Sequence, residues 1–213
     1  MPALIVVAAV ALGYLSGALA WGLWIGRVFR GIDVRQHGSK NLGATNVYRV
    51  LGPGLGIATL VLDILKGALP VRFIPAHPAM DAFPGGRDAC AVTVGLAAVV
   101  GHVWTCFTGF KGGKGVATTV GVLLALAPAA FGVFTAVFVA TVAITRYVSL
   151  GSVLGSVGFV VALAAWAPGG VRSPAFVVGG LLALLVIVRH RENLQRLARG
   201  EERRFSFKGG PST

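Results

Sequence analysis

Long apolar runs separated by short polar stretches dominate this chain of 213 residues. The runs fall at residues 3–26, 54–75, 89–108, 115–127, 129–145, 149–167 and 174–190. A helix that crosses a bilayer needs about 20 apolar residues, and most of the runs approach that length. The pattern therefore predicts an all-α integral membrane protein with about seven short transmembrane helices, built as a single transmembrane domain over residues 1–213.

The first run and the composition both favour a membrane protein. The run at residues 4–26 is longer than the apolar part of a signal peptide and has no lysine before it, so we expect it to stay as a span. Only 12% of the residues are charged and 55% are hydrophobic, whereas a soluble domain carries about 25% charged residues. The net charge of +12 indicates membrane orientation and anionic partners, and no nucleic acid partner is expected.

Residues 116–145 form one apolar run that Pro128 interrupts. Such a run is long for one helix and short for two. The distribution of basic residues between the two sides of the membrane distinguishes these cases. If Pro128 separates two helices, 15 basic residues fall on one side of the membrane and 3 on the other, with Lys66 inside a span. If one helix covers the run, the basic tail moves to the opposite face. The positive-inside rule favours seven spans, with the N-terminus outside and the C-terminus in the cytoplasm.

The first polar stretch, GSKNLGATNVYR, occupies residues 38–49 on the predicted cytoplasmic side. Its polar members are Ser39, Lys40, Asn41, Thr45, Asn46 and Arg49. Gly43 allows the backbone to approach a ligand closely, and the guanidinium fork of Arg49 suits a phosphate. A solvated loop between helices is the alternative, although such a loop needs fewer hydrogen-bond donors.

The second stretch, GFKGGKGVATT, lies at residues 109–119. Its glycine-lysine loop consists of Lys111, Gly112, Gly113, Lys114 and Gly115. Glycine amides and the positive end of the helix that follows together favour an anion. The loop is not a nucleotide-binding P-loop, because neither Ser nor Thr follows Lys114 and no strand precedes it. A flexible loop with two orienting lysines is the alternative. His102, earlier in the chain, is by itself more typical of a packed histidine than of a catalyst.

The third stretch, RHRENLQRLARGEE, covers residues 189–202. His190 and Asn193 are three positions apart, so a helix places them on one face, and Glu202 follows. A juxtamembrane segment that binds anionic lipid headgroups is the alternative; it explains Arg196, Arg199, Arg203 and Arg204 but not His190 and Asn193. From about residue 200 we expect a basic, partly disordered tail that ends in KGGPST.

Two pairs of polar residues lie at or inside predicted spans. Asp63 and Lys66, in LDILKG, fall inside the second span. Ionisable residues there are costly and are usually paired or functional, so a structural pair and a pair that supports the site both stay open. Ser149 and Ser152, in RYVSLGS, begin the sixth span at the cytoplasmic face, where they either cap the helix or contact substrate.

Metal and cofactor chemistry is not indicated by the sequence. No cluster with the spacing of metal ligands occurs, and Cys90 and Cys106 form no C-x-x-C pair, which is typical of packed core thiols. We therefore expect neither a metal nor a cofactor.

The stretches GSKNLGATNVYR, GHVWTCFTGFKGGKGVAT and RHRENLQRLARGEE together resemble the three signatures of the bacterial acyl-phosphate:glycerol-3-phosphate acyltransferase (PlsY-type) family. With LDILKG and RYVSLGS the resemblance covers nearly the whole chain. It implies a multi-pass enzyme of the bacterial inner membrane with an active site that faces the cytoplasm. Such an enzyme transfers a fatty acyl group from acyl phosphate to the sn-1 hydroxyl of glycerol 3-phosphate. The products are lysophosphatidic acid and phosphate, in the first acylation of phospholipid biosynthesis. An upstream enzyme that forms acyl phosphate is an expected partner.

The polar stretches and the resemblance together give expected roles to residues of this chain. The resemblance itself covers Ser39, Arg49, residues 111–115, His190, Asn193 and Glu202, and the other assignments rest on the polar stretches alone. The expected catalytic residues are Ser39, Arg49, His190 and Asn193. The expected substrate-binding residues are Asn41, Thr45, Asn46, Lys111, Gly112, Gly113, Lys114, Gly115, Ser149 and Ser152. Glu202, Asp63 and Lys66 are expected to be structural. The chain departs from the family at Lys40, where Gly is common, and at Thr105, where Pro is common, and neither change removes a catalytic group.

The expected reaction needs little covalent catalysis by the protein. Acyl phosphate is already activated, so positioning and charge stabilisation remain. Because carboxylates are scarce in the motifs, we expect the hydroxyl to attack the acyl carbonyl directly and to lose its proton to His190 or to the departing phosphate. The rival function is a membrane transporter of a phosphorylated solute. Its site belongs near the bilayer midplane between inverted halves, whereas the polar stretches here lie at one face.

Overall fold

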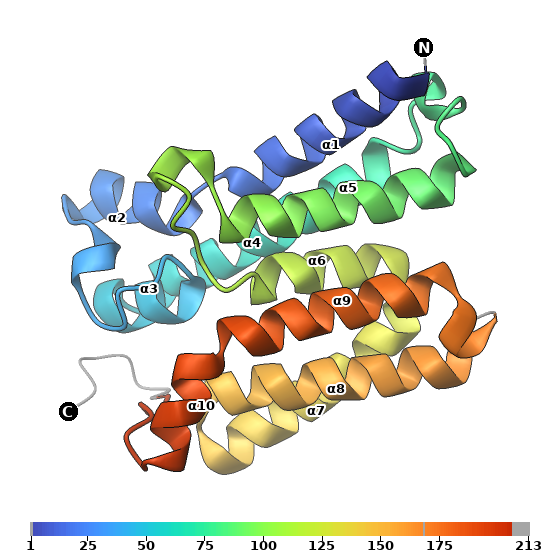
Figure 1. Ribbon diagram of the computed structural model, residues 1–213. Helices are drawn as coiled ribbons and strands as arrows, with labels where there is room; N and C mark the ends of the chain where they lie inside the picture. Colours follow the sequence, from blue (N-terminus) through green and yellow to red (C-terminus); the bar gives the residue numbers. More distant parts are fainter. Residues whose placement is uncertain (1, 168, 206–213) are drawn as a thin grey trace. The chain divides into compact units, whose positions relative to one another are not determined.

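The computed structural model describes residues 2–167 and 169–205, and every regular element within them is helical (Figure 1). The prediction of an all-α protein is thereby confirmed. The α-helices are α1 (Pro2–Ala18), α2 (Trp21–Arg30), α3 (Ala44–Leu51), α4 (Pro53–Phe73), α5 (Gly86–Val103), α6 (Val116–Leu126), α7 (Pro128–Thr145), α8 (Val148–Trp166), α9 (Pro174–Arg189) and α10 (Arg191–Ala198). Short 3-10 turns lie at η1 (Val34–Gln36), η2 (Pro78–Met80), η3 (Cys106–Thr108) and η4 (Gly170–Arg172).

The helices form two compact units. Unit 1, Met1–Leu126, contains α1 to α6, and unit 2, Ala127–Thr213, contains α7 to α10. The first two polar stretches belong to unit 1, and the third belongs to unit 2.

The apolar runs coincide with apolar helices. In the described residues five segments are long and apolar enough to cross a membrane, namely Pro2–Arg30, Pro53–Phe73, Gly86–Thr108, Pro128–Thr145 and Val148–Trp166. Val116–Leu126 and Ala175–Arg189 are shorter apolar helices. The predicted break at Pro128 is confirmed, because α6 ends one residue before Ala127 and Pro128 opens α7, where a missing amide hydrogen costs nothing. The number of helices that span the membrane stays a prediction.

The first predicted span is interrupted in the structure. Residues 3–26 lie within Pro2–Arg30, which is long and apolar enough to cross a membrane, but α1 ends at Ala18 and α2 begins at Trp21. Side chains from distant parts of the chain bind the carbonyl groups at the break: Thr105 Oγ1 donates to the Ala18 oxygen at 2.5 Å, and Lys66 Nζ donates to the Leu19 oxygen at 2.7 Å. These partners remove the penalty of interrupting the helix inside apolar surroundings.

Helices within each unit approach closely at small residues. In unit 1, α1 lies against α5 so tightly that a Cβ on Gly17 would come within 1.8 Å of the Ala98 oxygen. In the same way, α6 lies against α4, where a Cβ on Gly121 would come within 2.0 Å of the Ile64 oxygen. In unit 2, Gly155 of α8 faces the ring of Phe134 of α7. Close backbone approach at glycine is how helices associate where no hydrophobic effect drives them together.

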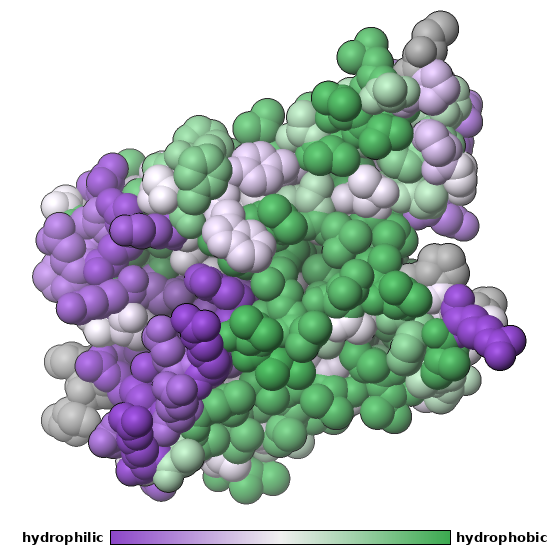
Figure 2. Space-filling view, viewed as in Figure 1, coloured by the Kyte–Doolittle hydropathy of each residue, from purple (hydrophilic) through white to green (hydrophobic). Residues whose placement is uncertain are grey.

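Apolar and hydrophilic side chains separate along the helices of each unit. Large apolar side chains are exposed on the long helices, such as Leu4 with 74% and Ile144 with 83% of their area. On the face shown in Figure 2, hydrophilic side chains gather over α2 and α3 in unit 1 and over α10 in unit 2. Extended apolar surface of this kind suits contact with lipid.

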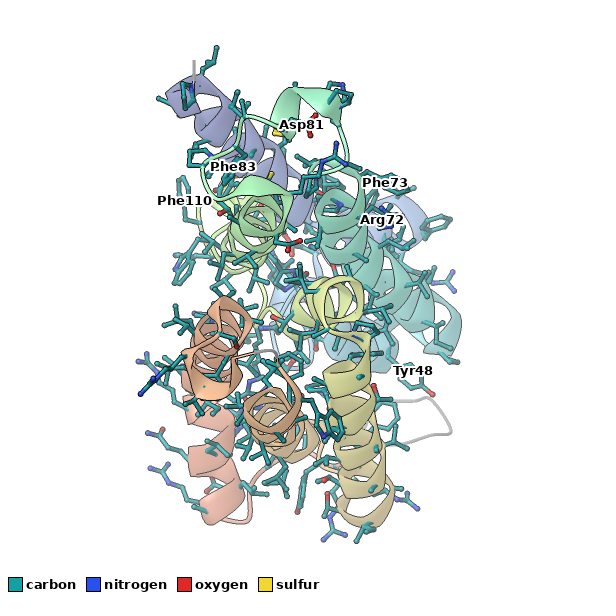
Figure 3. All side chains as sticks on the ribbon, turned by 90° about the vertical axis from the view of Figure 1, so that its right-hand side faces the viewer. Tyr48, Arg72, Phe73, Asp81, Phe83 and Phe110 are labelled. Carbon is teal, nitrogen blue, oxygen red and sulfur yellow. The ribbon has the colours of Figure 1, made fainter. Side chains whose placement is uncertain are left out.

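The connection between α4 and α5 lies at the end of unit 1 away from α3. Figure 3 shows Arg72 and Phe73 at the end of α4, and Asp81 and Phe83 in the connection. Arg87, near the start of α5, donates from Nη2 to Oδ1 of Asp81 at 2.6 Å, and both side chains are exposed. This end of unit 1 is poor in basic residues compared with the end that carries the first two polar stretches.

Candidate active site

The first polar stretch folds around the side chain of Asn46, which is 1% exposed in the first turn of α3. Its Oδ1 accepts a hydrogen bond from the amide of Ser39 at 2.7 Å. Its Nδ2 donates to the carbonyl oxygens of Val34 at 2.9 Å, His37 at 3.2 Å and Asn41 at 2.9 Å. Asn46 thus uses its polar atoms inside the fold and fixes the backbone of Ser39.

Four other polar side chains of this stretch are exposed or half-buried. Ser39 and Lys40 are exposed, and Lys40 has a φ of 59°, in the left-handed region that few residues with side chains adopt. Thr45 and Arg49 lie four positions apart on α3 and therefore share one face of that helix, where both are half-buried. The stretch presents a hydroxyl and two cationic side chains at one end of unit 1.

Hydrogen bonds inside the first stretch and just before it stabilise the local backbone. Asn41 Oδ1 accepts a hydrogen bond from the amide of Gly43 at 2.8 Å, which closes the turn before α3. Asp33 accepts from Arg35 Nη2 at 2.6 Å and from Arg27 Nη2 at 3.3 Å. The side-chain hydrogen bond from Arg35 is the main reason that the pKa of Asp33 lies far below its usual range.

The glycine-lysine loop folds back onto the end of α5. The amide of Gly112 donates to the Val103 oxygen at 3.0 Å, and the amide of Gly113 donates to the His102 oxygen at 3.2 Å. The sequence pattern predicts that these glycine amides face an anion. In the structure the amides of Gly112 and Gly113 instead donate to carbonyl groups at the end of α5, because the loop folds back onto that helix.

The loop leads directly into α6. Thr108 Oγ1 donates to the Lys111 oxygen at 2.9 Å, which fixes the start of the loop. Gly115 has a φ of 84° and accepts a hydrogen bond from the Thr119 amide at 2.8 Å, so it closes the loop and opens the helix. Lys111 is exposed and Lys114 is half-buried. Two lysines therefore flank a pair of glycines next to the positive end of a helix.

In unit 2, His190 lies buried at the junction of α9 and α10. Its Nδ1 is 2.7 Å from the carbonyl oxygen of Val186. A carbonyl only accepts hydrogen bonds, so Nδ1 carries the hydrogen. In the neutral ring Nε2 is then the nitrogen that can take up a proton, which is the form that a general base requires.

Glu202 gathers three donors of unit 2 around its carboxylate. Oε1 accepts from Asn193 Nδ2 at 2.6 Å and from Ser149 Oγ at 2.7 Å, and Oε2 accepts from Arg196 Nε at 2.9 Å. Burial raises the pKa of Glu202, but the hydrogen bonds from these three side chains outweigh burial and leave the pKa below its usual value. Glu202 is therefore ionised at neutral pH and holds the orientation of Asn193 and Ser149.

The remaining serine and the tail of unit 2 also have partners. Ser152 is buried and its Oγ donates to the Val148 oxygen at 2.8 Å, within α8. Arg204 Nε donates to the Tyr147 hydroxyl at 3.3 Å, and the amide of Phe205 donates to the Arg146 oxygen at 2.7 Å. Residues 201–205, without regular structure, thus lie on the turn between α7 and α8. The predicted disordered end KGGPST lies outside the described residues.

The sequence matches a family of known proteins along most of its length. The family model described as "Glycerol-3-phosphate acyltransferase" matches residues 7–200. The chain belongs to this family. It is 43% identical over 208 residues to the glycerol-3-phosphate acyltransferase of Desulforudis audaxviator, covering 98% of this chain and 100% of that one. It is 45% identical over 197 residues to that of Geobacter sulfurreducens, covering 92% and 95%.

Solved structures of the glycerol-3-phosphate acyltransferase family show the same fold. The crystal structure of PlsY (YgiH), an integral membrane glycerol 3-phosphate acyltransferase, in its glycerol 3-phosphate form matches with a TM-score of 0.82 and 36% identity, covering 94% of this chain and 96% of that one. The lysophosphatidic acid form matches with a TM-score of 0.80. Together with the apolar helices described above, this likeness shows a multi-pass membrane protein.

The sequence pattern did not mark several residues in or beside the candidate stretches of each unit. Asp33, Arg35 and Arg196 became visible through their ion pairs, and His102 through its contact with the glycine-lysine loop. The short spacing of Asp33 and Arg35 was a readable signal, whereas His102 is brought to Gly113 only by the fold. Among the described residues no group of three or more His, Cys, Asp or Glu side chains lies close enough to hold a metal ion.

Proposed function

We propose that this chain transfers a fatty acyl group from acyl phosphate to the sn-1 hydroxyl of glycerol 3-phosphate and releases lysophosphatidic acid and inorganic phosphate. Membership of the glycerol-3-phosphate acyltransferase family over nearly the whole chain is the observation that carries this proposal. The related PlsY structures, in glycerol 3-phosphate and lysophosphatidic acid forms, support the acceptor and the product. The choice of acyl phosphate as the donor rests on the resemblance of the three motifs.

The cationic residues of unit 1 are proposed to bind the phosphates. Lys111 and Lys114 act as point charges on the phosphate of glycerol 3-phosphate, and Arg49 offers a planar fork to a phosphate. Ser39, held through its amide by Asn46, supplies an exposed hydroxyl in the same unit. We assign Asn41, Thr45 and Asn46 to this part of the site, with Asn46 acting through the position of Ser39.

The reaction is a single acyl transfer. The oxygen of the sn-1 hydroxyl forms a bond to the acyl carbonyl carbon, and the bond between that carbon and the phosphate oxygen breaks, so phosphate leaves with the electron pair. The hydroxyl proton passes to Nε2 of His190, or else to the departing phosphate. Positioning and charge stabilisation supply the acceleration, because the donor is already activated. Asn193, oriented by Glu202, is the proposed partner of the reacting groups in unit 2.

We further propose seven membrane spans, with the N-terminus outside and the motifs at the cytoplasmic face of the inner membrane. The separation of α6 from α7 at Pro128 and the low number of basic residues near the α4–α5 connection support this topology. Reporter fusions after Arg87 and after Arg204 test it. A fusion after Arg87 is expected to report the outside and one after Arg204 the cytoplasm, and the same side for both contradicts the topology.

The acyl donor gives the sharpest test of the proposed function. Purified protein is supplied with labelled glycerol 3-phosphate and either palmitoyl phosphate or palmitoyl-CoA. Labelled lysophosphatidic acid is expected with palmitoyl phosphate and not with palmitoyl-CoA. Product formed from palmitoyl-CoA alone would overturn the donor assignment while it leaves the acyltransferase family intact.

A further inference from the structure

A buried ion pair lies beneath the first two polar stretches in unit 1. Nζ of Lys66 lies 2.8 Å from Oδ1 of Asp63 one turn earlier on α4, and the two side chains are 3% and 2% exposed. Nζ also donates to the Leu19 oxygen at 2.7 Å, at the break between α1 and α2. Buried charges persist only where partners satisfy them closely. The pair is therefore a fixed point inside the unit.

His102, near the end of α5, lies beside this pair. Its Nδ1 is 3.8 Å from Oδ1 of Asp63, and its side chain is 6% exposed. His102, Asp63, Lys66 and Gly113 all line one small cavity. The ring of His102 thus lies between the ion pair and the glycine-lysine loop.

The loop rests on His102 at two consecutive glycines. A Cβ placed on Gly113 would come within 2.2 Å of Nε2 of the ring. A Cβ placed on Gly112 would come within 2.0 Å of the backbone oxygen of the same residue. The side chain of His102 therefore contacts Gly113, and its backbone oxygen contacts Gly112 and accepts the hydrogen bond from the Gly113 amide. The two glycines lie between Lys111 and Lys114. The position of their backbone therefore determines the position of both lysines.

We propose that His102 is a positioning residue for glycerol 3-phosphate. Its ring lies against Asp63 of the buried pair on one side and contacts the glycine-lysine loop at Gly113 on the other. Through this contact it determines where Lys111 and Lys114 are placed for the phosphate. This inference rests on the proposed function of the loop. A displacement of about 1 Å in a binding group is enough to cost about 10²-fold in activity, so a support beneath the loop matters although it does not touch substrate.

Substitution of His102 tests this role through a split between kinetic constants. His102→Ala is expected to raise KM for glycerol 3-phosphate by about tenfold or more, and to leave KM for palmitoyl phosphate within about twofold. A merely structural residue would lower the amount of folded enzyme and leave both KM values unchanged. If His102→Ala does not accumulate as folded protein, His102→Gln takes its place in the same measurements. An unchanged KM for glycerol 3-phosphate would overturn the inference.

A double-mutant cycle adds a test that depends on the contact itself. Gly113→Ala alone is expected to raise KM for glycerol 3-phosphate, because its methyl group meets the ring of His102. Removing the ring makes room, so the pair Gly113→Ala with His102→Ala is expected to bind better than Gly113→Ala alone. Gly112→Ala is the matched control: its methyl group meets backbone atoms, so His102→Ala cannot relieve it. Equal rescue of both alanines, or of neither, would contradict the proposed support.

The lysine variants separate failure of this inference from failure of the proposed function. Lys111→Ala and Lys114→Ala are measured in parallel for KM of glycerol 3-phosphate. If they raise KM and the His102 variants do not, the loop binds the phosphate without the proposed support. If they leave KM unchanged, the loop is not the phosphate site and the proposed function of this loop fails.

Discussion

Nδ2 of Asn193 donates a hydrogen bond of 2.6 Å to Oε1 of Glu202, nine positions further along the chain. The chain returns to α10 after Gly200, whose φ of 73° suits a residue without a side chain. The same carboxylate also binds Ser149 and Arg196. Glu202, in the segment that follows α10, therefore fixes side chains from both α8 and α10. An ionised carboxylate with three donors is a strong and specific anchor.

Substitution of this anchor is expected to loosen unit 2. Glu202→Gln removes the charge and places an amide among donors, so we expect a loss of about 1 to 3 kcal/mol in stability and a fall in kcat. Thermal unfolding in detergent and steady-state kinetics measure both. Glu201→Gln, on an exposed neighbour, is the control and is expected to change neither. Equal effects of the two substitutions would contradict the role of Glu202.

Asp33 is expected to make stability depend on pH. Its pKa in the folded protein is lowered, chiefly by the side-chain hydrogen bond from Arg35, so its stabilising effect is present above its unfolded pKa of about 3.9 and is lost as pH falls further. Asp33→Asn should therefore destabilise at pH 7 by about 1 to 2 kcal/mol, with the difference from the parent shrinking below about pH 4. Chemical unfolding at several pH values measures it.

A second Asp–Arg pair provides the control for this prediction. Asp81 and Arg87 are as close, at 2.6 Å, but both side chains are more than half exposed. Exposed pairs contribute about 0 to 1 kcal/mol, so Asp81→Asn should have a smaller effect at pH 7 than Asp33→Asn. A larger effect at Asp81 would contradict the argument from burial.

The backbone at Lys40 predicts different stabilities for two small substitutions. Its φ of 59° costs a residue with a side chain about 1 kcal/mol, and glycine avoids this cost. Lys40→Gly should therefore be more stable than Lys40→Ala by about 1 kcal/mol, although both remove the same charge. Thermal unfolding compares them, and equal stability would show that the left-handed backbone is not strained.

The tautomer of His190 predicts its kinetic role. With Nδ1 bound to the Val186 oxygen, Nε2 is the ring nitrogen that can take up a proton, so His190→Ala should lower kcat by about 10² or more. Arg191→Ala, at the exposed neighbouring position, should leave kcat nearly unchanged. Near-normal turnover of His190→Ala would assign the proton to the departing phosphate instead.

The apolar pattern was sufficient to predict the apolar helices and the break at Pro128, but neither α3 nor the break after Ala18. Pro128 carries its own signal in the sequence, because proline cannot continue a helix without losing a hydrogen bond. The break after Ala18 has no such signal, since residues 17–26 contain only apolar residues and glycine. Its cause lies in hydrogen bonds from Lys66 and Thr105, which only the packed structure brings to that point.

The same distinction holds for the candidate site. Residue types and spacing marked the motifs, because phosphate chemistry needs cations, small residues and hydroxyls together. They did not reveal that Gly112 and Gly113 use their amides within the fold, or that Asn46 holds the backbone of Ser39. Such roles depend on partners that are set by tertiary packing rather than by local sequence.

The most direct test of the central claim is phosphate release by the purified protein from palmitoyl phosphate, with and without glycerol 3-phosphate. We predict release that depends on glycerol 3-phosphate and matches lysophosphatidic acid formation one to one, with no acyl group trapped on Ser39. Release without the acceptor, with an acyl group on Ser39, would contradict direct attack. No release under any condition, with glycerol 3-phosphate still bound, would contradict the acyltransferase itself.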